Sequence, residues 1–322
     1  MTGPAKRPGK LSDLAPEHSL KRLELAVTRR LDGLLHGEHL GMLPGPGSDF
    51  AEARLYQPGE DDVRHMDWAV TARTTVPHVR DLIADHELET WALVDMSSSM
   101  DFGTANMEKR DLVVAALAAI GFLTTRLGDR LGAYIVHDGG LRRWPARTGR
   151  AAMYALLQAL LDSPRGEGGG QGPPLAEAIT SLARSQYKRG LRVVISDFLD
   201  AERTRDGEPA WERPMRRLAV RHQVIAVEII DPRELDLPDV GPVMMTDPET
   251  GEVREIILSA KVRAAYAAAA AEQRARTREA IRGCGVPHLV LRTDRDWVGD
   301  VARFALQQRR VAGRAQPQGS RA

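Results

Sequence analysis

Residues 89–99 read Glu-Thr-Trp-Ala-Leu-Val-Asp-Met-Ser-Ser-Ser, a short apolar run that ends at Asp95 and continues into serines. Four further runs rich in Val, Ile and Leu follow along the chain, each ending at or near an aspartate. They are residues 131–136 before Asp138, 191–195 before Asp197, 224–230 before Asp231, and 288–291 before Asp294. Continuously apolar strands are typical of parallel sheets covered on both faces, so these five runs predict such a sheet.

Segments with helical spacing separate the apolar runs. Residues 110–127, 151–161 and 175–184 place their apolar side chains on one helical face. Residues 260–282 are rich in Ala, which has a high helix propensity, and we expect this helix to end at Gly283. Strands alternating with helices predict an α/β fold with a doubly wound, mostly parallel, Rossmann-like sheet.

The composition excludes several classes of protein. The chain has 322 residues with 45 Lys and Arg against 44 Asp and Glu, whereas a dedicated nucleic-acid or membrane-surface binder needs a field of one sign. The single Cys284 rules out an intrachain disulfide and a cysteine zinc site, consistent with a reducing compartment. No apolar stretch approaches roughly 18 residues, and the first residues lack the apolar core of a signal peptide. We therefore expect a cytoplasmic protein without a membrane span.

The chain divides into four parts by composition. Residues 1–16 and the basic tail 310–322 are polar and without an apolar period, so we expect both to be disordered. Residues 17–84 contain a helical pattern followed by alternating charges, which predicts an N-terminal helix and a small β leader subdomain. We expect this leader to pack on the main domain, residues 85–309, with Trp68 buried as an anchor.

Oxygen donors gather after the first apolar run. In open α/β sheets ligands bind beyond the carboxyl ends of the strands, where the strand order reverses. Asp95, Ser97 and Ser99 can keep a common side as the chain leaves its strand, and Asp197 could add a carboxylate across the cleft. Such hard oxygens suit Mg²⁺ or Mn²⁺. These residues could instead cap the helix that follows, or form a docking surface without a metal.

Other catalytic motifs are absent from the sequence. The glycine-rich loop 166–172 has no Lys before its helix, so it is not a phosphate-binding P-loop. No G-x-S-x-G nucleophile motif occurs, and Cys284 has no nearby base in the sequence.

Two parts of the sequence resemble known families. Asp95-x-Ser97-x-Ser99 resembles the metal-ion-dependent adhesion site of von Willebrand factor A-type domains. Residues 54–68, Arg-Leu-Tyr-Gln-Pro-Gly-Glu-Asp-Asp-Val-Arg-His-Met-Asp-Trp, with Ala72-Arg73, resemble the leader of the bacterial domain-of-unknown-function family fifty-eight. Residues 246–252, Thr-Asp-Pro-Glu-Thr-Gly-Glu, are similar to a connector in that family. The resemblance covers roughly residues 22–309.

The resemblance implies a fold and a function. The strands would run in the order 3-2-1-4-5-6, with the site between strands one and four. The protein would be a non-enzymatic adaptor or co-chaperone that acts with a MoxR-type AAA+ ATPase on a client protein. Ser97 and Ser99 would bind the metal directly, Asp95 and Asp197 would hold it partly through water, and a partner's carboxylate would complete the shell.

The sequence departs from the A-type pattern in one place. A-type domains have a threonine in the loop between strands three and four, whereas residues 166–175 contain neither Thr nor Ser. The alternative function is a metal-dependent hydrolase using the same oxygens. Such an enzyme needs a general base near the metal, and Asp138 and Asp231 are the candidates by their positions after strands.

Overall fold

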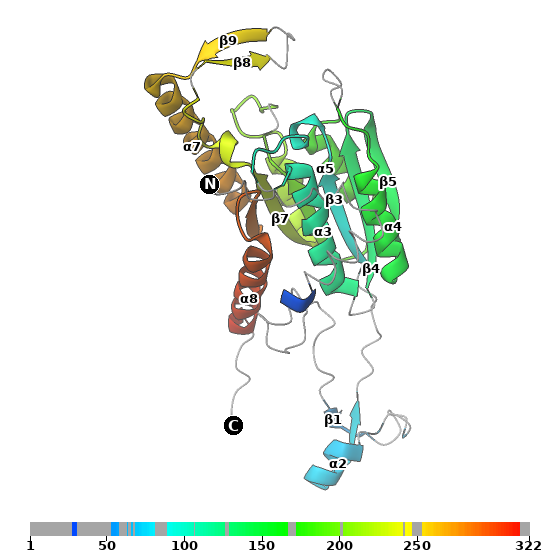
Figure 1. Cartoon of the computed structure of the whole chain (residues 1–322). Helices are drawn as coiled ribbons and strands as arrows, with labels where there is room; N and C mark the ends of the chain where they lie inside the picture. The colour runs from blue at the N-terminus through cyan, green and yellow to red at the C-terminus, as the bar shows by residue number, and fades with distance from the viewer. Residues whose placement is uncertain are drawn as a thin grey trace, which may run out of the picture.

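A six-stranded sheet forms the centre of the molecule (Figure 1). The structure is a computed structural model, and it describes residues 28–30, 53–57, 63, 66, 68–80, 89–105, 107–125, 129–166, 172–199, 202–240, 242–246 and 253–315. The strands are β3 (Glu89–Asp95), β4 (Arg130–His137), β5 (Gly140–Arg147), β6 (Leu191–Ser196), β7 (Gln223–Ile230) and β10 (His288–Arg292). Five of them coincide with the predicted apolar runs.

The strand order confirms the predicted fold. Across the sheet the strands lie in the order β5-β4-β3-β6-β7-β10. Numbered along the chain, this is 3-2-1-4-5-6, the order expected of a von Willebrand A-like domain. All neighbouring strands are parallel except β5, which is antiparallel to β4. The chain therefore reverses direction across the sheet between β3 and β6, which creates a switch point there.

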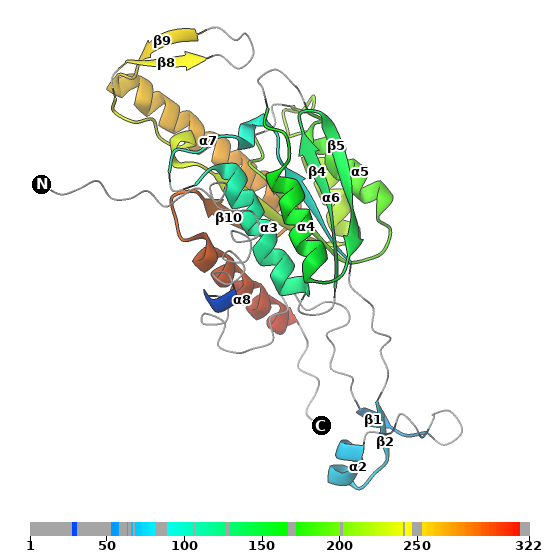
Figure 2. The same cartoon turned by 45° about the vertical axis from the view of Figure 1, so that its right-hand side comes forward.

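Helices cover both faces of the sheet, as Figure 2 shows. One face packs against α3 (Lys109–Thr125), α4 (Arg150–Leu161) and α8 (Trp297–Ala315). The other face packs against α5 (Leu175–Ser185), α6 (Glu212–Arg221) and the C-terminal end of α7 (Ala260–Gly283). Alternate residues of one strand enter the two cores: Ala92 and Val94 face α3, whereas Trp91 and Leu93 face α5. This double coverage explains why the strands are continuously apolar.

Strand β5 forms one edge of the sheet and was not predicted. Its sequence, Gly-Leu-Arg-Arg-Trp-Pro-Ala-Arg, has only one fully buried side chain, Ala146, so it lacks the apolar run that marks the central strands. The pairing with β4 shifts register between Leu131 and Ala133, which is a bulge. An edge strand tolerates Pro145 because one side of it is unpaired.

The path from β7 to α8 contains features that the sequence only partly predicted. A 3-10 turn, η4 (Pro232–Glu234), follows β7, and the strands β8 (Pro242–Thr246) and β9 (Val253–Ile257) pair as an antiparallel hairpin at the distal end of α7 (Figure 1). Most of the predicted connector 246–252 lies outside the described residues. Helix α7 includes Gly283, and the glycine with a left-handed φ of 69° is Gly285. The helix thus ends at Gly283 as predicted, and the left-handed glycine that follows is two residues further along the chain.

The C-terminal end of the folded region differs from expectation. Helix α8 runs to Ala315, so it extends into the segment 310–322 for which disorder was predicted. Residues 1–16 lie outside the described residues, and of the predicted N-terminal helix only the helical residues 28–30 are described. Among the described residues no helix is both long enough and apolar enough to cross a bilayer.

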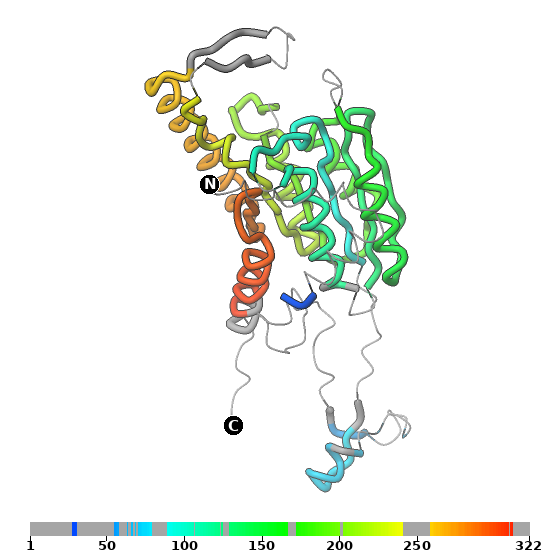
Figure 3. The backbone as a smooth tube through the Cα atoms, viewed as in Figure 1, coloured from blue at the N-terminus to red at the C-terminus, as the bar shows by residue number. Residues whose placement is uncertain are grey.

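The leader is a small unit of β1 (Ala53–Leu55), α2 (Trp68–Thr74) and β2 (His78–Arg80), in which the two strands pair antiparallel. It lies apart from the sheet in Figures 1 and 2, and the backbone tube in Figure 3 shows the same arrangement. Trp68 is 69% exposed, so the prediction that it is a buried anchor is wrong. Three-residue strands and a seven-residue helix offer no apolar face that could cover an indole ring.

Candidate functional site

The site lies where β3 and β6 end side by side. The two strands are parallel and Val94 pairs with Ile195, so Asp95 and the Ser196-Asp197 pair leave the sheet at the same edge. This is the switch point, because β3 continues to β4 on one side and borders β6 on the other. The structure therefore brings together the two acidic strand ends that the sequence proposed.

Asp95 is the centre of a hydrogen-bonded cluster. Its Oδ1 accepts from the Ser97 amide at 3.1 Å and from the Ser97 hydroxyl at 2.6 Å. Its Oδ2 accepts from the Ser196 hydroxyl at 2.7 Å. Ser97 Oγ and Ser99 Oγ lie 3.2 Å apart, so these two hydroxyls and one carboxylate form a continuous oxygen surface.

The capping alternative for the serines is not what the structure shows. Ser97 stands at the N-cap position of the 3-10 turn η3 (Ser98–Met100), but its side chain makes no capping hydrogen bond. Its hydroxyl is engaged with Asp95 and Ser99 instead. The local backbone is held by the Asp95 carboxylate on the Ser97 amide, which leaves the hydroxyls directed at one another.

Asp197 is held by a buried ammonium group. Lys109, the first residue of α3, is completely buried and donates to Asp197 Oδ2 at 2.7 Å and to Glu234 Oε1 at 2.5 Å. Asp197 Oδ1 accepts from the Leu199 amide at 3.0 Å. Phe198 between them has a left-handed φ of 55°, a strained conformation for a residue with a Cβ and one that clusters at functional sites.

The two aspartates of the site have opposite pKa shifts. Burial raises the pKa of Asp95, and the neighbouring Asp197 carboxylate raises it further, against hydrogen bonds from Ser97 and Ser196. Burial would also raise the pKa of Asp197, but the Lys109 ammonium and hydrogen bonds from Leu199 and Ser99 hold it below its ordinary value. The pKa of Lys109 is raised because Asp197 and Glu234 outweigh the effect of its burial. Asp197 therefore has a cationic partner at neutral pH and Asp95 has none among the described residues.

The oxygen cluster opens into a cavity of about 400 Å³. The cavity is lined by side chains from the ends of three strands and by the start of α5, namely Asp95, Ser97, Ser98, Ser99, Val136, Asp138, Gly172, Pro173, Pro174, Leu175, Ser196, Asp197, Leu199 and Glu202. The two described ends of the glycine-rich loop 166–172 lie close to residues of this cavity wall. A Cβ on Gly166 would lie 2.3 Å from Asp138 Oδ2, and one on Gly172 would lie 2.7 Å from the His137 carbonyl oxygen.

The loop supplies no hydroxyl where A-type domains have a threonine. Gly172, Pro173 and Pro174 occupy that wall of the cavity, and residues 167–171 lie outside the described residues. Asp138, one of the two candidate bases, lies in the same wall: its Oδ1 accepts from the Ser98 amide at 3.1 Å. Its Oδ2 is buried without a hydrogen-bond partner in the described part of the chain.

Asp231, the other candidate base, does not reach the cavity. It is fully buried, and its carboxylate accepts from Thr104, Thr293 and the Arg233 amide. Burial would raise the pKa of Asp231, but these hydrogen bonds keep it low. Asp231 therefore fastens the loop after η3 to the ends of β7 and β10, which is a structural role.

The donor set fits a small, hard cation. Adjacent ligands of an octahedral ion at about 2.1 Å are separated by about 3.0 Å, close to the 3.2 Å between Ser97 Oγ and Ser99 Oγ. Among the described residues no three His, Cys, Asp or Glu side chains are grouped so that they could hold a metal. A cation here would therefore depend on the two hydroxyls, with the carboxylates behind them.

Sequence reasoning missed Lys109 and Glu234. Lys is disfavoured in the first turn of a helix, because the helix dipole presents positive charge there. A lysine at the start of the apolar helix α3 was therefore a signal of a nearby carboxylate. Glu234 gave no comparable signal, since its contact with Lys109 joins residues 125 positions apart.

Comparison with known proteins gave matches along most of the chain. A family model described as "Protein of unknown function DUF58" matches residues 52–276. The uncharacterized protein Rv1480 of Mycobacterium tuberculosis (strain ATCC 25618 / H37Rv) is 52% identical over 309 residues, which cover 96% of this chain and 95% of that protein. The uncharacterized protein Mb1516 of Mycobacterium bovis matches with the same identity and the same coverage.

Solved structures match at low sequence identity. BatB, a conserved hypothetical protein from Bacteroides thetaiotaomicron, is 18% identical with a TM-score of 0.41, covering 71% of this chain and all (100%) of that one. A von Willebrand factor type A protein from Catenulispora acidiphila is 12% identical with a TM-score of 0.37, covering 73% of this chain and 44% of that one.

Proposed function

The chain is a member of the DUF58 family, and we propose that it is a non-enzymatic protein-binding module whose cleft offers a divalent cation to a partner. The cation is Mg²⁺ or Mn²⁺, held in the manner of a metal-ion-dependent adhesion site. Ser97 and Ser99 bind it directly, and Asp95 and Asp197 hold it partly through water. An Asp or Glu side chain of the partner completes its coordination.

The observation that carries this proposal is the charge balance of the cleft. Asp95 is only 8% exposed, next to a second carboxylate, and its charge is met by hydroxyl and amide donors but by no cation in the described structure. A buried carboxylate without a cation is costly, as its raised pKa reflects. A divalent ion bound at the two hydroxyls would remove that cost.

The proposed partner is a MoxR-type AAA+ ATPase, with the protein acting as its adaptor or co-chaperone for a client in the cytoplasm. A metal–carboxylate contact in a partly desolvated cleft is directional, and a partner that withdraws its acidic side chain releases it. Such a contact suits an ATPase that changes conformation during its cycle.

Thermal unfolding with and without the ion tests the metal site. If Mg²⁺ binds with a Kd of about 1 mM, about 10 mM Mg²⁺ stabilises the protein by about 1.4 kcal/mol. The Tm then rises by roughly 3 to 6 °C for a domain of this size. The variants Asp95→Ala and Ser97→Ala with Ser99→Ala should lose the shift.

Ser98→Ala is the matched control, because it removes a hydroxyl one residue away whose side chain takes no part in the oxygen cluster. It should keep the full shift. An absent shift in the wild type, or an equal shift in Asp95→Ala, contradicts the metal site.

Co-purification tests the partner. A purified MoxR-type ATPase should be retained by the immobilised protein in Mg²⁺ and released by EDTA. Retention that persists in the double serine variant would favour a docking surface that needs no metal.

The alternative, a metal-dependent hydrolase, rests on one observation. Asp138 lines the cavity beside the proposed metal ligands, where a general base would have to lie, and one of its oxygens has no hydrogen-bond partner among the described residues. Hydrolysis of model phosphate or peptide substrates that requires Mn²⁺ or Mg²⁺, and is lost in both Asp95→Ala and Asp138→Asn, would support it over the adaptor.

A further inference from the structure

A second cavity lies between α5 and α6, away from the oxygen cluster. Its volume is about 430 Å³, and the residues around it include Arg184, Tyr187, Arg217, Leu218, Arg221 and His222. These residues come from the C-terminal halves of the two helices and the residues that follow them. The helices lead into β6 and β7, so this groove lies toward the edge where those strands begin. We call it the α5/α6 groove.

The rim of the groove carries unbalanced positive charge. Arg184, Arg217 and Arg221 are all exposed, and none of them has a carboxylate within ion-pair distance in the described part of the chain. Arg217 and Arg221 are four residues apart on one helix, where like charges repel. By contrast, Arg213 and Arg216 of the same helix pair with Asp206 and Glu212. A negatively charged group that balances these three arginines would therefore have to come from a ligand.

Helix dipoles account for only part of this cluster. Arg184 and Arg221 lie in the last turns of α5 and α6, where a cation gains about 0.3–1 kcal/mol from the dipole. Arg217 lies a turn earlier, and the stabilisation of helix ends does not require the side chains to surround a common cavity. Helix dipoles therefore do not explain why all three arginines lie around one groove.

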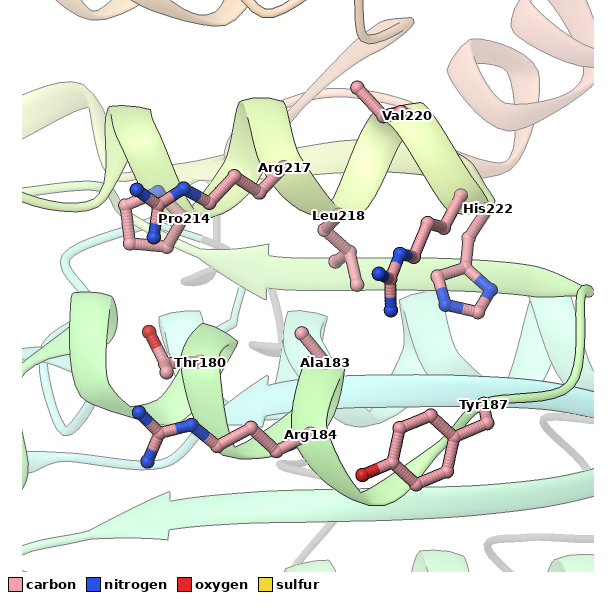
Figure 4. A pocket seen from close by; sticks show the side chains of 10 residues that line it. Thr180, Ala183, Arg184, Tyr187, Pro214, Arg217, Leu218, Val220 and His222 are labelled. Atoms are coloured by element: carbon pink, nitrogen blue, oxygen red, sulfur yellow. The ribbon is translucent and has the colours of Figure 1, made fainter.

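The floor of the groove is apolar, and a tyrosine lies at one end of it. Figure 4 shows Ala183 and Leu218 between the two helices, with Arg184 and Tyr187 on the α5 side and Arg217 and His222 on the α6 side. Tyr187 is 79% exposed and lies at the end of the groove. Aromatic and arginine side chains around an apolar floor are the residues that dominate binding energy in protein interfaces.

His222 closes the groove with an unused polar atom. Its side chain is 7% exposed, and its Nδ1 is buried without a hydrogen-bond partner in the described structure. This nitrogen has almost no accessible surface, so His222 forms the end wall of the groove and its Nδ1 is not itself a ligand contact. Burial and the surrounding arginines lower the pKa of His222 to about 4, so the ring is neutral at pH 7.

We infer that the α5/α6 groove binds a short acidic segment of a partner protein. Acidic side chains of the segment pair with Arg184, Arg217 and Arg221, and an apolar side chain between them packs on Leu218 and Tyr187. A peptide is favoured over a nucleic acid because the floor is apolar and a single exposed aromatic ring offers little base stacking. The net charge of +1 also gives no extended field for a polyanion.

The test uses a short fluorescein-labelled peptide in which Leu residues alternate with pairs of Asp and Glu. Fluorescence anisotropy with the full chain should show saturable binding that weakens as salt is raised. The same peptide with Lys in place of every acid should not bind. Arg217→Glu with Arg221→Glu should lower the affinity at least about tenfold, and Tyr187→Ala about threefold to tenfold.

Arg278→Glu with Arg282→Glu is the matched control. These exposed arginines have the same spacing and lie at the end of another helix, α7, so the variant has the same net charge. It should bind the peptide as the wild type does. An equal loss in the control pair, or full binding by the groove variant, overturns the inference. If charge reversal prevents folding, Arg217→Gln with Arg221→Gln tests the same contacts.

Two further ligands test which class of molecule the groove binds. A single-stranded oligonucleotide or phosphatidylglycerol vesicles that bind more tightly than the peptide, and lose binding in the groove variant, overturn the assignment to a protein partner. Peptide binding should be unaffected by EDTA and by Ser97→Ala with Ser99→Ala. Peptide binding to the groove is therefore tested independently of the metal site.

Discussion

Lys109 decides how much negative charge the candidate metal site can hold. Its ammonium is fully buried and lies between Asp197 and Glu234, so it neutralises part of a cluster that would otherwise repel itself. Asp95 has no such partner in the described structure, which leaves one carboxylate for an external cation. Lys109 thus balances the charge of Asp197 and Glu234, and Asp95 is the carboxylate whose charge only a bound cation would balance.

Replacing Lys109 by Met should destabilise the protein by about 3–5 kcal/mol, because one partner of a buried charge pair is lost while the carboxylates stay. Urea unfolding in EDTA at pH 7 measures the change. Lys261→Met is the control, since Lys261 also lies in the first turn of a helix but is exposed. The control should stay within about 0.5 kcal/mol of the wild type. Equal stability of both variants would contradict the role of Lys109.

His222 predicts a pH dependence of stability. The folded state holds the pKa of His222 at about 4, below its ordinary value of 6.5, so the unfolded chain binds the proton more tightly between these two pH values. Stability contributed by this group is complete above pH 6.5 and is lost as the pH falls toward 4, by on the order of 3 kcal/mol. Urea unfolding across this range should show a shallower decline for His222→Gln. Parallel curves for the two proteins would rule this out.

At the scale of elements, the end of α7 shows how a glycine's position decides its role. Gly285 has a left-handed φ of 69°, and a Cβ there would meet nothing within 4 Å, so only its backbone conformation requires glycine. Gly283 is helical, and a Cβ would make an ordinary contact of 3.6 Å with Glu212. The same substitution should therefore have opposite effects two residues apart.

Gly285→Ala should destabilise the protein by about 1 kcal/mol, because a Cβ disfavours the left-handed region. Gly283→Ala should stabilise it by about 0.5–1 kcal/mol, since Ala is the better helix former. Chemical denaturation of both variants measures the difference. A stabilising Gly285→Ala would show that α7 ends differently.

Helices and strands could be predicted where their burial requires a regular pattern of apolar residues. Five strands carry unbroken apolar runs because helices cover them on both sides, and the predicted helices agree with α3, α4, α5 and α7 to within a few residues. Strand β5 and helices α6 and α8 were missed because each carries several arginines, which obscure its apolar pattern.

The site was predictable only to the level of strand ends. Asp95 and Asp197 could be placed together because parallel strands end at one edge, and Ser97 and Ser99 follow by alternation. Lys109 and Glu234 could not, because their meeting depends on how α3 and η4 pack against the sheet. The burial of Trp68 was wrongly predicted, because the hydrophobicity of its indole ring does not show whether the fold places other apolar residues around it.

At the scale of the whole molecule, a chain of charges joins the cleft to the long helix α7. Glu234 accepts from Lys109 through Oε1 and from Arg274 of α7 through Oε2, at 2.5 and 3.1 Å. Arg274 also donates to the Asp197 carbonyl oxygen and to Glu228. Helix α7 is thus connected with the cleft through one shared carboxylate.

A double-mutant cycle should detect this connection. Lys109→Met and Arg274→Met share Glu234, so their effects on the free energy of unfolding should deviate from additivity by about 0.5–3 kcal/mol. Arg110→Met with Arg274→Met is the control, because Arg110 pairs with Asp101 and shares no partner with Arg274. This pair should be additive within about 0.5 kcal/mol. Additivity in both pairs would mean that the chain of charges carries no coupling.

The outer strand β5 also bears on how copies of the molecule meet. Pro145 has no N–H to offer an incoming strand, and Arg142, Arg143 and Arg147 would place positive charges opposite those of a second copy. Arg142 and Arg143 are further tied over the rings of Trp144 and Trp91. The free edge of β5 therefore disfavours pairing with the same strand of a second copy. At high concentration the protein should not form extended β-aggregates through this edge.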